Sequence, residues 1–359
     1  MVINMADKAS KRQANLELLR IVLILMIIAV HYMVKGDPAS YSNNGWTPLY
    51  AVVRILTAFG VPSLNCYVFI SGYFMVDAEW KPGRVVSLLV QVLFYSILVP
   101  LVLLGLGIIP WGSLNLYDWL GFFLPIETEH YWFATAYLYL YLFSPILVAG
   151  VKHMEKRTLQ IVIIVLLLFF SVGKSVVPVY LVTDKGGYDY GWLLCLFLVA
   201  AYLRLYGLEW LEKKGRGLGF YIVMSFGAFL LSTLSEFLSA KIGKFSYYVD
   251  IPYTLNHVCI LLASLGLFMV FKNLRIQEGT AAKVIRKLAP YTFGVYLLHE
   301  HILVRYRWID WLQTDKVRGT WLFLPHMAGC VLVVYLAGVL IDSVRTYAFS
   351  KIRRLQWKR

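Results

Sequence analysis

The sequence predicts an all-α protein, a polytopic bundle of about ten transmembrane helices with both termini in the cytoplasm. Hydrophobic residues make up 60% of its 359 residues and the mean hydropathy is +0.67, whereas soluble domains are about 45–50% apolar. The apolar residues form runs long enough to cross a bilayer, which takes about 20 residues. Basic residues gather in the short loops between alternate runs, as the positive-inside rule describes.

Ten apolar runs of spanning length follow one another along the chain. They cover residues 16–35, 49–76, 84–109, 131–150, 158–177, 189–206, 217–237, 253–272, 289–305 and 320–344. The second run is expected to be broken, because it contains Gly60, Pro62 and Gly72. Residues 111–129 are too short and too mixed for a span, so we expect an interfacial or re-entrant piece there on the outer side.

The loop charges orient the bundle. Of the 34 Lys and Arg residues, 22 fall in the termini and loops on one side, nine fall on the other side, and three lie within the spans. An even number of spans puts both termini on one side, and the excess of basic residues makes that side the cytoplasm. The expected organisation is a cytoplasmic tail at 1–15, an integral membrane domain at 16–344 and a basic cytoplasmic tail at 345–359.

The net charge and the cysteines exclude two classes of function. The formal charge of +14 does not indicate nucleic-acid binding, because the charges occupy short loops as a topology signal does. The four cysteines lie in apolar segments with no paired spacing. We interpret them as buried small hydrophobic residues, not as disulfides or metal ligands.

The first span carries Glu17, Arg20 and His31, and ionisable groups inside a span are costly enough to suggest function. Eleven residues at ~100° and ~1.5 Å each place His31 within about 20° of the face of Arg20 and about 16 Å further along the axis. A neutral histidine can take a proton from an attacking hydroxyl near pH 7. The alternative is that Arg20 snorkels to the cytoplasmic headgroups and His31 is an interfacial polar residue.

The other histidines add candidates, since six of the seven map to the outer half. His299 is expected at a depth close to that of His31, so the two could line one cavity. Glu300 or Glu129 could orient a histidine, and the sequence does not choose between them. The hydroxyls of Tyr137 and Tyr141, one helical turn apart, could bind sugar or help position the acyl group, although most such aromatic residues serve packing or the interfacial belt.

Four fragments, in order, resemble a known family. They are Arg20 and His31 separated by ten residues in the first span, Phe69-Ile70-Ser71-Gly72-Tyr73, His130-Tyr131-Trp132-Phe133 followed by Tyr137, Tyr141 and Ser144-Pro145, and Tyr291-Thr292-Phe293-Gly294-Val295-Tyr296-Leu297-Leu298-His299. Together they resemble the bacterial membrane-bound acyltransferase-3 family, which O-acetylates cell-surface glycans. The resemblance spans about Asn15 to His299.

The resemblance implies transfer of an acyl group, usually acetyl, from cytoplasmic acyl-CoA to a hydroxyl of an outward-facing or lipid-linked glycan. It assigns His31 as the catalytic residue and Arg20 to donor binding. Lys81 and Arg84 stand where the family often has an arginine pair that binds donor phosphate.

The fourth predicted span reads Trp132-Phe133-Ala134 and lacks the glutamate of one branch of the family. The chain therefore resembles the branch without an appended extracellular domain. Candidates for acceptor binding or support are Glu17, Ser71, His130, Trp132, Tyr137, Tyr141, Tyr296, His299 and Glu300.

The expected donor substrate is acetyl-CoA, and neither a metal nor a nucleic acid is expected to bind. The protein is expected in the cytoplasmic membrane of a bacterium, in contact with its lipids. Transport of a small molecule such as an amino acid is the competing function, because a polar Arg–His face and broken helices would also suit a carrier. A non-catalytic scaffold leaves the intramembrane arginine and histidine unexplained.

Overall fold

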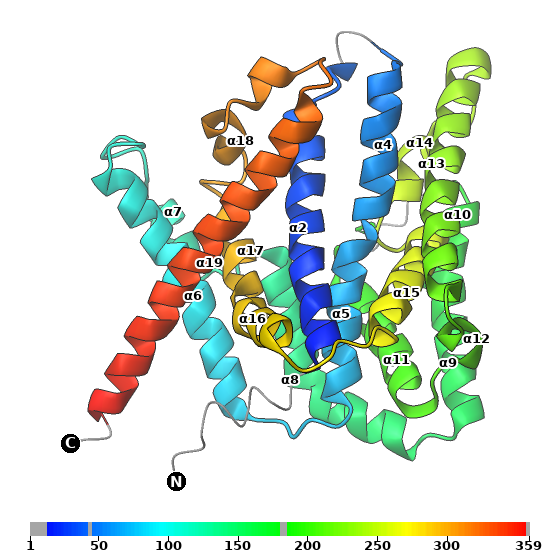
Figure 1. Ribbon diagram of the computed structural model, residues 1–359, viewed down its shortest axis with the longest axis horizontal. Helices are drawn as coiled ribbons and strands as arrows, with labels where there is room; N and C mark the ends of the chain where they lie inside the picture. The colour runs from blue at the N-terminus through cyan, green and yellow to red at the C-terminus, as the bar shows by residue number, and fades with distance from the viewer. Residues whose placement is uncertain (1–12, 42–44, 180–184, 357–359) are drawn as a thin grey trace. The chain divides into compact units, whose positions relative to one another are not determined.

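The computed structural model describes residues 13–41, 45–179 and 185–356, and every regular element in them is a helix (Figure 1). The described residues contain no strand. The predicted all-α class is therefore confirmed.

Within the described residues, eight helices are long and apolar enough to cross a membrane. They are α2 (Ala14–Gly36), α4 with α5 (Pro48–Met75), α6 (Pro82–Gly105), α8 (Trp132–His153), α9 with α10 (Lys156–Val176), α13 (Arg216–Ile242), α14 with α15 (Tyr247–Lys272) and α19 (Phe323–Gln356). A ninth apolar helix, α11 (Tyr190–Tyr206), has 17 residues.

The predicted span at 289–305 is shorter than expected. The chain there forms a 3₁₀ turn, η3 (Ala289–Tyr291), then α17 (Thr292–His299), and continues in turns. The total of ten spans and the cytoplasmic side of both termini stay predictions.

The second span breaks where a proline follows a glycine. Helix α4 ends at Gly60 and α5 begins with Pro62, which has no N–H to donate to the preceding turn. The expected break at Gly72 was wrong, because Gly72 lies inside α5. A Cβ atom there would come within 2.9 Å of Ala200 Cβ, so glycine at this position allows α5 and α11 to pack closely.

The segment at 111–129, which the sequence predicts on the outer side, contains one short helix, α7 (Leu116–Phe123). Asn115 and Asp118 form a reciprocal capping box at its start, which stabilises a helix of only eight residues. Its Leu116 and Tyr117 side chains are exposed. Eight residues are too few to span a bilayer, as the sequence predicted.

The chain divides into two compact units. The first comprises residues 1–40, 89–131 and 275–359, and the second comprises 41–88 and 132–274. The first unit contains α2, α6 from Leu89 onward, α7, α16 (Thr280–Leu288), α17, α18 (Arg307–Trp311) and α19. The second contains α4, α5, the start of α6, and α8 to α15.

In the first unit, α2 packs against α16, α17 and α19. Leu19, Leu23 and Ile28 of α2 are fully buried. Gly338 brings α19 against α17, since a Cβ atom there would lie 2.8 Å from Val295 Cα. In Figure 1, α2 begins beside α16, and α19 ends at the lower left.

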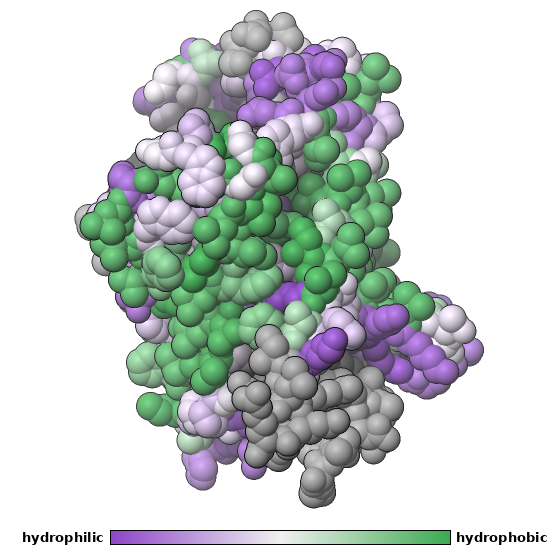
Figure 2. All heavy atoms as spheres, turned by 90° about the vertical axis from the view of Figure 1, so that its left-hand side faces the viewer, coloured by the Kyte–Doolittle hydropathy of each residue, from purple (hydrophilic) through white to green (hydrophobic). Residues whose placement is uncertain are grey.

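The outward face of α6 and α19 is hydrophobic. Figure 2 shows this face as a broad apolar band with hydrophilic residues above and below it. Leu101 of α6 and Leu336 and Leu340 of α19 are among its exposed side chains. Exposed aliphatic residues on helices of spanning length are expected to face lipid.

Candidate active site

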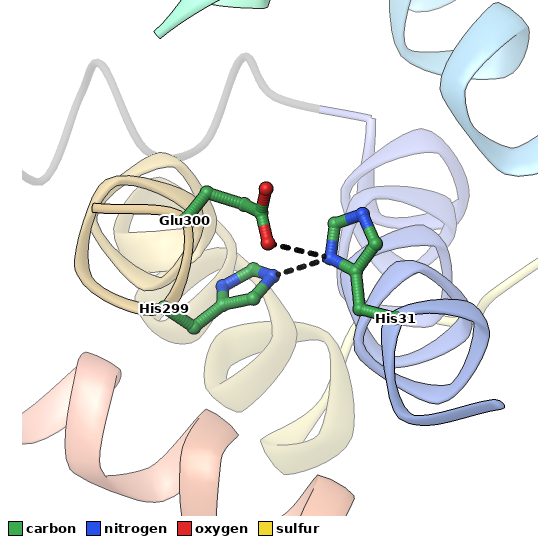
Figure 3. Close-up of side chains that lie close together, drawn as sticks. All are labelled: His31, His299 and Glu300. Atoms are coloured by element: carbon green, nitrogen blue, oxygen red, sulfur yellow. Dashed lines mark hydrogen bonds and ion pairs between the residues drawn. The ribbon is translucent and has the colours of Figure 1, made fainter. Parts of the chain in front are cut away.

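The centre of the candidate site is His31, which lies five residues, about one and a half turns, before α2 ends at Gly36. Helix α2 packs against α17, and this contact brings His31 to the end of α17, where His299 and Glu300 stand. Nδ1 of His31 lies 3.1 Å from Nε2 of His299 and 3.1 Å from Oε1 of Glu300 (Figure 3). The His31 side chain is 24% exposed, so it can still be reached from outside the cluster.

Hydrogen bonding within the cluster indicates the tautomer of both rings. Nδ1 of His299 lies 2.7 Å from the carbonyl oxygen of Val295, which can only accept, so Nδ1 carries the proton. Nε2 of a neutral His299 is then an acceptor, as is the Glu300 carboxylate. His31 therefore donates from Nδ1, and its Nε2 keeps a free lone pair. The cluster holds His31 as a base whose reactive nitrogen points away from its two partners.

Lys35 balances the charge of the cluster. It lies one turn beyond His31 on α2 and forms an ion pair with the same oxygen of Glu300 that faces His31. Its ammonium also lies 5.5 Å from the centroid of the Tyr306 ring. The carboxylate is thus compensated by a cation inside the protein, which a buried charge requires.

His31, His299 and Glu300 could hold a metal ion, because their ligand atoms all lie within 4.8 Å of one another. Two imidazole nitrogens and one carboxylate oxygen suit a divalent cation such as Zn²⁺. Lys35 opposes this use, since its ammonium occupies the Glu300 oxygen and would repel a cation.

A second histidine pair lies in the same unit. The rings of His130 and His301 have centroids 4.5 Å apart, and both histidines are buried. Burial, and then the charge of Arg305, lower the pKa of His130 to about 4. Nε2 of His130 accepts from the backbone N–H of Ile302 at 3.4 Å, and Arg305 donates to its carbonyl oxygen at 3.2 Å. These bonds give His130 a role in fixing the segment that follows Glu300.

Arg20 lies at the opposite end of α2, 3.9 Å from Glu17. Helix α16, which packs against α2, carries basic residues near this end. The carboxylate of Glu17 acts electrostatically on Arg286 of α16, and Arg286 is ion-paired with Glu278. Arg286 entered the sequence prediction only as one of the 22 basic residues that orient the bundle. No motif in the sequence indicated that α16 packs beside Arg20.

Lys81 and Arg84 belong to the second unit, and both are exposed. Lys81 pairs with Glu79 at 3.2 Å. The Tyr141 hydroxyl accepts from the backbone N–H of Lys81 at 3.1 Å, and its ring stacks on Trp80. Tyr141 therefore fixes the turn that presents Lys81, and its role in binding sugar stays a prediction.

The remaining candidates make packing contacts. In the second unit, Ser71 donates to the carbonyl oxygen of Tyr67 at 2.9 Å, Trp132 packs on Tyr188, and Tyr137 stacks on Phe133. In the first unit, Tyr296 lies between the rings of Tyr131 and His299, with centroids 6.2 Å and 6.3 Å away. Of these four, Tyr296 is the one beside the histidine cluster.

Sequence reasoning did not single out Asp342, a fully buried carboxylate in α19. Oδ1 of Asp342 accepts from Tyr95 at 3.0 Å, from Gln91 at 3.1 Å and from Arg345 at 2.7 Å. Gly294 of α17 leaves the space that the carboxylate fills. The signal was present in the sequence, since an acidic residue inside an apolar run needs partners.

Comparison with known proteins identifies the chain at the level of family. Neither curated proteins nor solved structures give a match. A family model described as an acyltransferase domain matches residues 13–349, nearly the whole chain. The match includes both ends of α2, the histidine cluster and Asp342, and the chain therefore belongs to the acyltransferase-3 family of membrane acyltransferases.

Proposed function

We propose that this protein is a membrane O-acyltransferase that moves an acetyl or other short acyl group from cytoplasmic acyl-CoA to a hydroxyl of a cell-surface or lipid-linked glycan. Membership of the acyltransferase-3 family supports acyl transfer in general. The observation that carries the finer assignment is the His31–His299–Glu300 cluster, which leaves Nε2 of His31 as an available base.

In the proposed reaction, Nε2 of His31 accepts the proton of the acceptor hydroxyl while the hydroxyl oxygen attacks the thioester carbonyl. A carbon–oxygen bond forms and the carbon–sulfur bond breaks. The departing CoA thiolate then takes the proton from His31. Glu300 stabilises the imidazolium that exists between the two proton transfers, because its carboxylate lies 3.1 Å from Nδ1.

The donor is proposed to approach from the Arg20 end of α2. Guanidinium and ammonium groups suit the phosphates of CoA, and Arg20 and α16 supply them on one unit. Lys81 and Arg84 are further donor-binding candidates. About 16 Å of helix separates Arg20 from His31, a length that the extended arm of CoA would have to cover.

Transfer by purified protein in liposomes tests the proposal, with radiolabelled acetyl-CoA as donor and cell-envelope glycans as acceptor. His31→Ala should lower the rate by about 10²- to 10⁴-fold, the usual contribution of a positioned base. His153→Ala is the matched control, because its ring is exposed and bonds to the carbonyl oxygen of Ala149 in its own helix. EDTA should leave the rate unchanged, since Lys35 opposes metal binding. A correctly inserted, fully active His31→Ala protein would remove the assignment.

Transport of a small molecule is the competing proposal, supported by the broken helix at Gly60 and Pro62. Substrate counterflow in liposomes without thioester cleavage would favour a carrier. Cleavage of acetyl-CoA that depends on His31 would favour the enzyme. Mass spectrometry of envelope glycans with and without the gene would then identify the acceptor in a bacterial host.

A further inference from the structure

The first unit contains an apolar cavity that the proposed reaction does not use. It measures about 290 Å³ and is lined by α6, α19, the segment 298–312 and, at one wall, His299. This volume is just below the range of about 300–1,000 Å³ typical of small-ligand sites. Its wall includes His299, the imidazole that contacts His31, so an occupant of the cavity would lie against a member of the histidine cluster.

The lining favours a hydrocarbon occupant. No charged residue lines the cavity, and its walls are formed mainly by leucine, valine and aromatic side chains. The Tyr95 hydroxyl, one of the few polar groups in the lining, is already used by Asp342. A polar ligand buried here would lose its hydrogen bonds to water without replacement, which is unfavourable.

The cavity opens toward the lipid-facing surface. Val102 of α6 and Val333 of α19 both line it and are 44% and 53% exposed. Exposed aliphatic side chains on helices of spanning length are expected to face lipid. A hydrocarbon chain can therefore enter sideways from the bilayer, whereas an α-helix about 10 Å across is too wide for a cavity of this volume.

One donor at the cavity wall lacks a partner. The indole N–H of Trp308 is buried and makes no hydrogen bond with any residue that the structure describes. Trp308 packs against His299, with ring centroids 6.5 Å apart. A buried N–H without an acceptor is rare, and an oxygen of a headgroup placed between the cavity and His31 would supply one.

We propose that this cavity holds the hydrocarbon chain of a lipid that carries the acceptor hydroxyl. This inference rests on the proposed acyl transfer, and it restricts the acceptor to a lipid-anchored glycan. The donor is a less suitable occupant, because its charged CoA portion is assigned to the Arg20 end of α2, whereas the cavity adjoins His299. A chain seated between α6 and α19 would hold the sugar beside Nε2 of His31.

Photolabelling of the full-length protein in liposomes directly tests whether a lipid chain binds in this cavity. The probe is a glucosyl diacylglycerol with a diazirine in one acyl chain, and phosphatidylcholine with the same labelled chain is the comparison lipid. The glycolipid should label peptides from α6 and from residues 298–312. Ala337→Phe, which fills the cavity from α19, should reduce that labelling about tenfold, equivalent to about 1.4 kcal/mol of binding.

Ala348→Phe is the matched control, because Ala348 is also an exposed alanine of α19 but does not line the cavity. Val102→Phe is the second variant, should Ala337→Phe fail to fold. Equal labelling by the two lipids, or labelling unaffected by both cavity variants, would overturn the inference.

The readout also separates this inference from the proposed function, because labelling requires no acyl transfer. Specific labelling by the glycolipid without transfer from acetyl-CoA would support lipid binding in the cavity and reject the proposed reaction. Transfer to a soluble glucoside without specific labelling would support the proposed reaction and reject lipid binding in the cavity. If both proposals hold, Ala337→Phe should lose transfer to the glycolipid while keeping transfer to the soluble glucoside.

Discussion

One carboxylate oxygen of Glu300 lies 3.1 Å from Nδ1 of His31. The contact joins the residue directly after α17 to a residue within α2, which stands 269 positions earlier in the chain. In the proposed reaction it would keep the His31 ring in the tautomer that presents Nε2 as a base, and it would place a negative charge where the imidazolium forms. Glu300 thus acts as a positioning residue for His31.

Replacement of Glu300 by glutamine should separate orientation from charge. The Glu300→Gln side chain still offers an oxygen to Nδ1 of His31 but no longer stabilises the imidazolium. We expect kcat to fall by about 10²-fold, part of the 10²- to 10⁴-fold that a positioned base provides, with the KM for acetyl-CoA unchanged. Glu129→Gln is the control, since Glu129 is the other carboxylate that the sequence allowed and it is exposed. Equal rates for the two variants would contradict a role for Glu300.

Removal of Lys35 should destabilise the protein through Glu300. The side chains of Lys35 and Glu300 are only 11% and 14% exposed, so the Lys35→Met variant leaves a largely buried carboxylate unpaired. Loss of one partner of a buried pair costs about 3–5 kcal/mol. Thermal unfolding in detergent should show a lower midpoint for Lys35→Met and recovery in the double variant with Glu300→Gln. Failure of the second substitution to restore stability would show that Lys35 does not act through this pair.

The sequence predicted the depth of the candidate site along the helices better than it predicted which residues form the site. Counting residues along two apolar runs placed His31 and His299 at similar depths, and the two rings are in contact. The choice of Glu300 over Glu129 depends on where α17 ends, and helix ends are the least certain part of such a prediction. The contact between α2 and α17 joins segments far apart in the sequence, and no periodicity encodes it.

The misses have a similar cause. Asp342 was not singled out because its three donors come from α6 and from α19 itself, and the packing of α6 on α19 is not visible in either run. Gly72 was expected to interrupt a helix, but its role is to admit Ala200 of α11. In both cases the residue type was informative, and its meaning depended on a neighbouring helix.

Acidification should destabilise the protein through His130, which lies outside the spanning helices. Its pKa is about 4 in the folded protein against 6.5 for a free histidine, chiefly because it is buried. The unfolded chain therefore binds more protons between these values, and stability falls as the pH drops from 6.5 toward 4. A difference of about 2.5 between the two pKa values lowers the free energy of unfolding by about 3 kcal/mol once the pH is below 4.

The comparison of wild type with His130→Gln measures this effect. The midpoint of thermal unfolding should fall between pH 7 and pH 5 in both proteins, and it should fall less in His130→Gln because glutamine does not titrate. His153→Gln controls for the loss of an exposed histidine. Parallel pH profiles for wild type and His130→Gln would show that His130 does not contribute.

Replacement of Arg20 by glutamine should weaken donor binding more than it slows chemistry. Arg20 lies about 16 Å along α2 from His31, too far for contact with the reacting thioester, and it stands beside the basic helix α16. We expect the KM for acetyl-CoA to rise about tenfold, corresponding to the loss of about 1.4 kcal/mol of binding to a phosphate, while kcat changes little. The effect should shrink at high ionic strength, because salt screens a partly exposed cation. Lys213→Gln, at an exposed position in the second unit, is the charge-matched control and should leave KM unchanged. A fall in kcat with KM constant would instead place Arg20 in the chemical step and would require the donor to bind elsewhere.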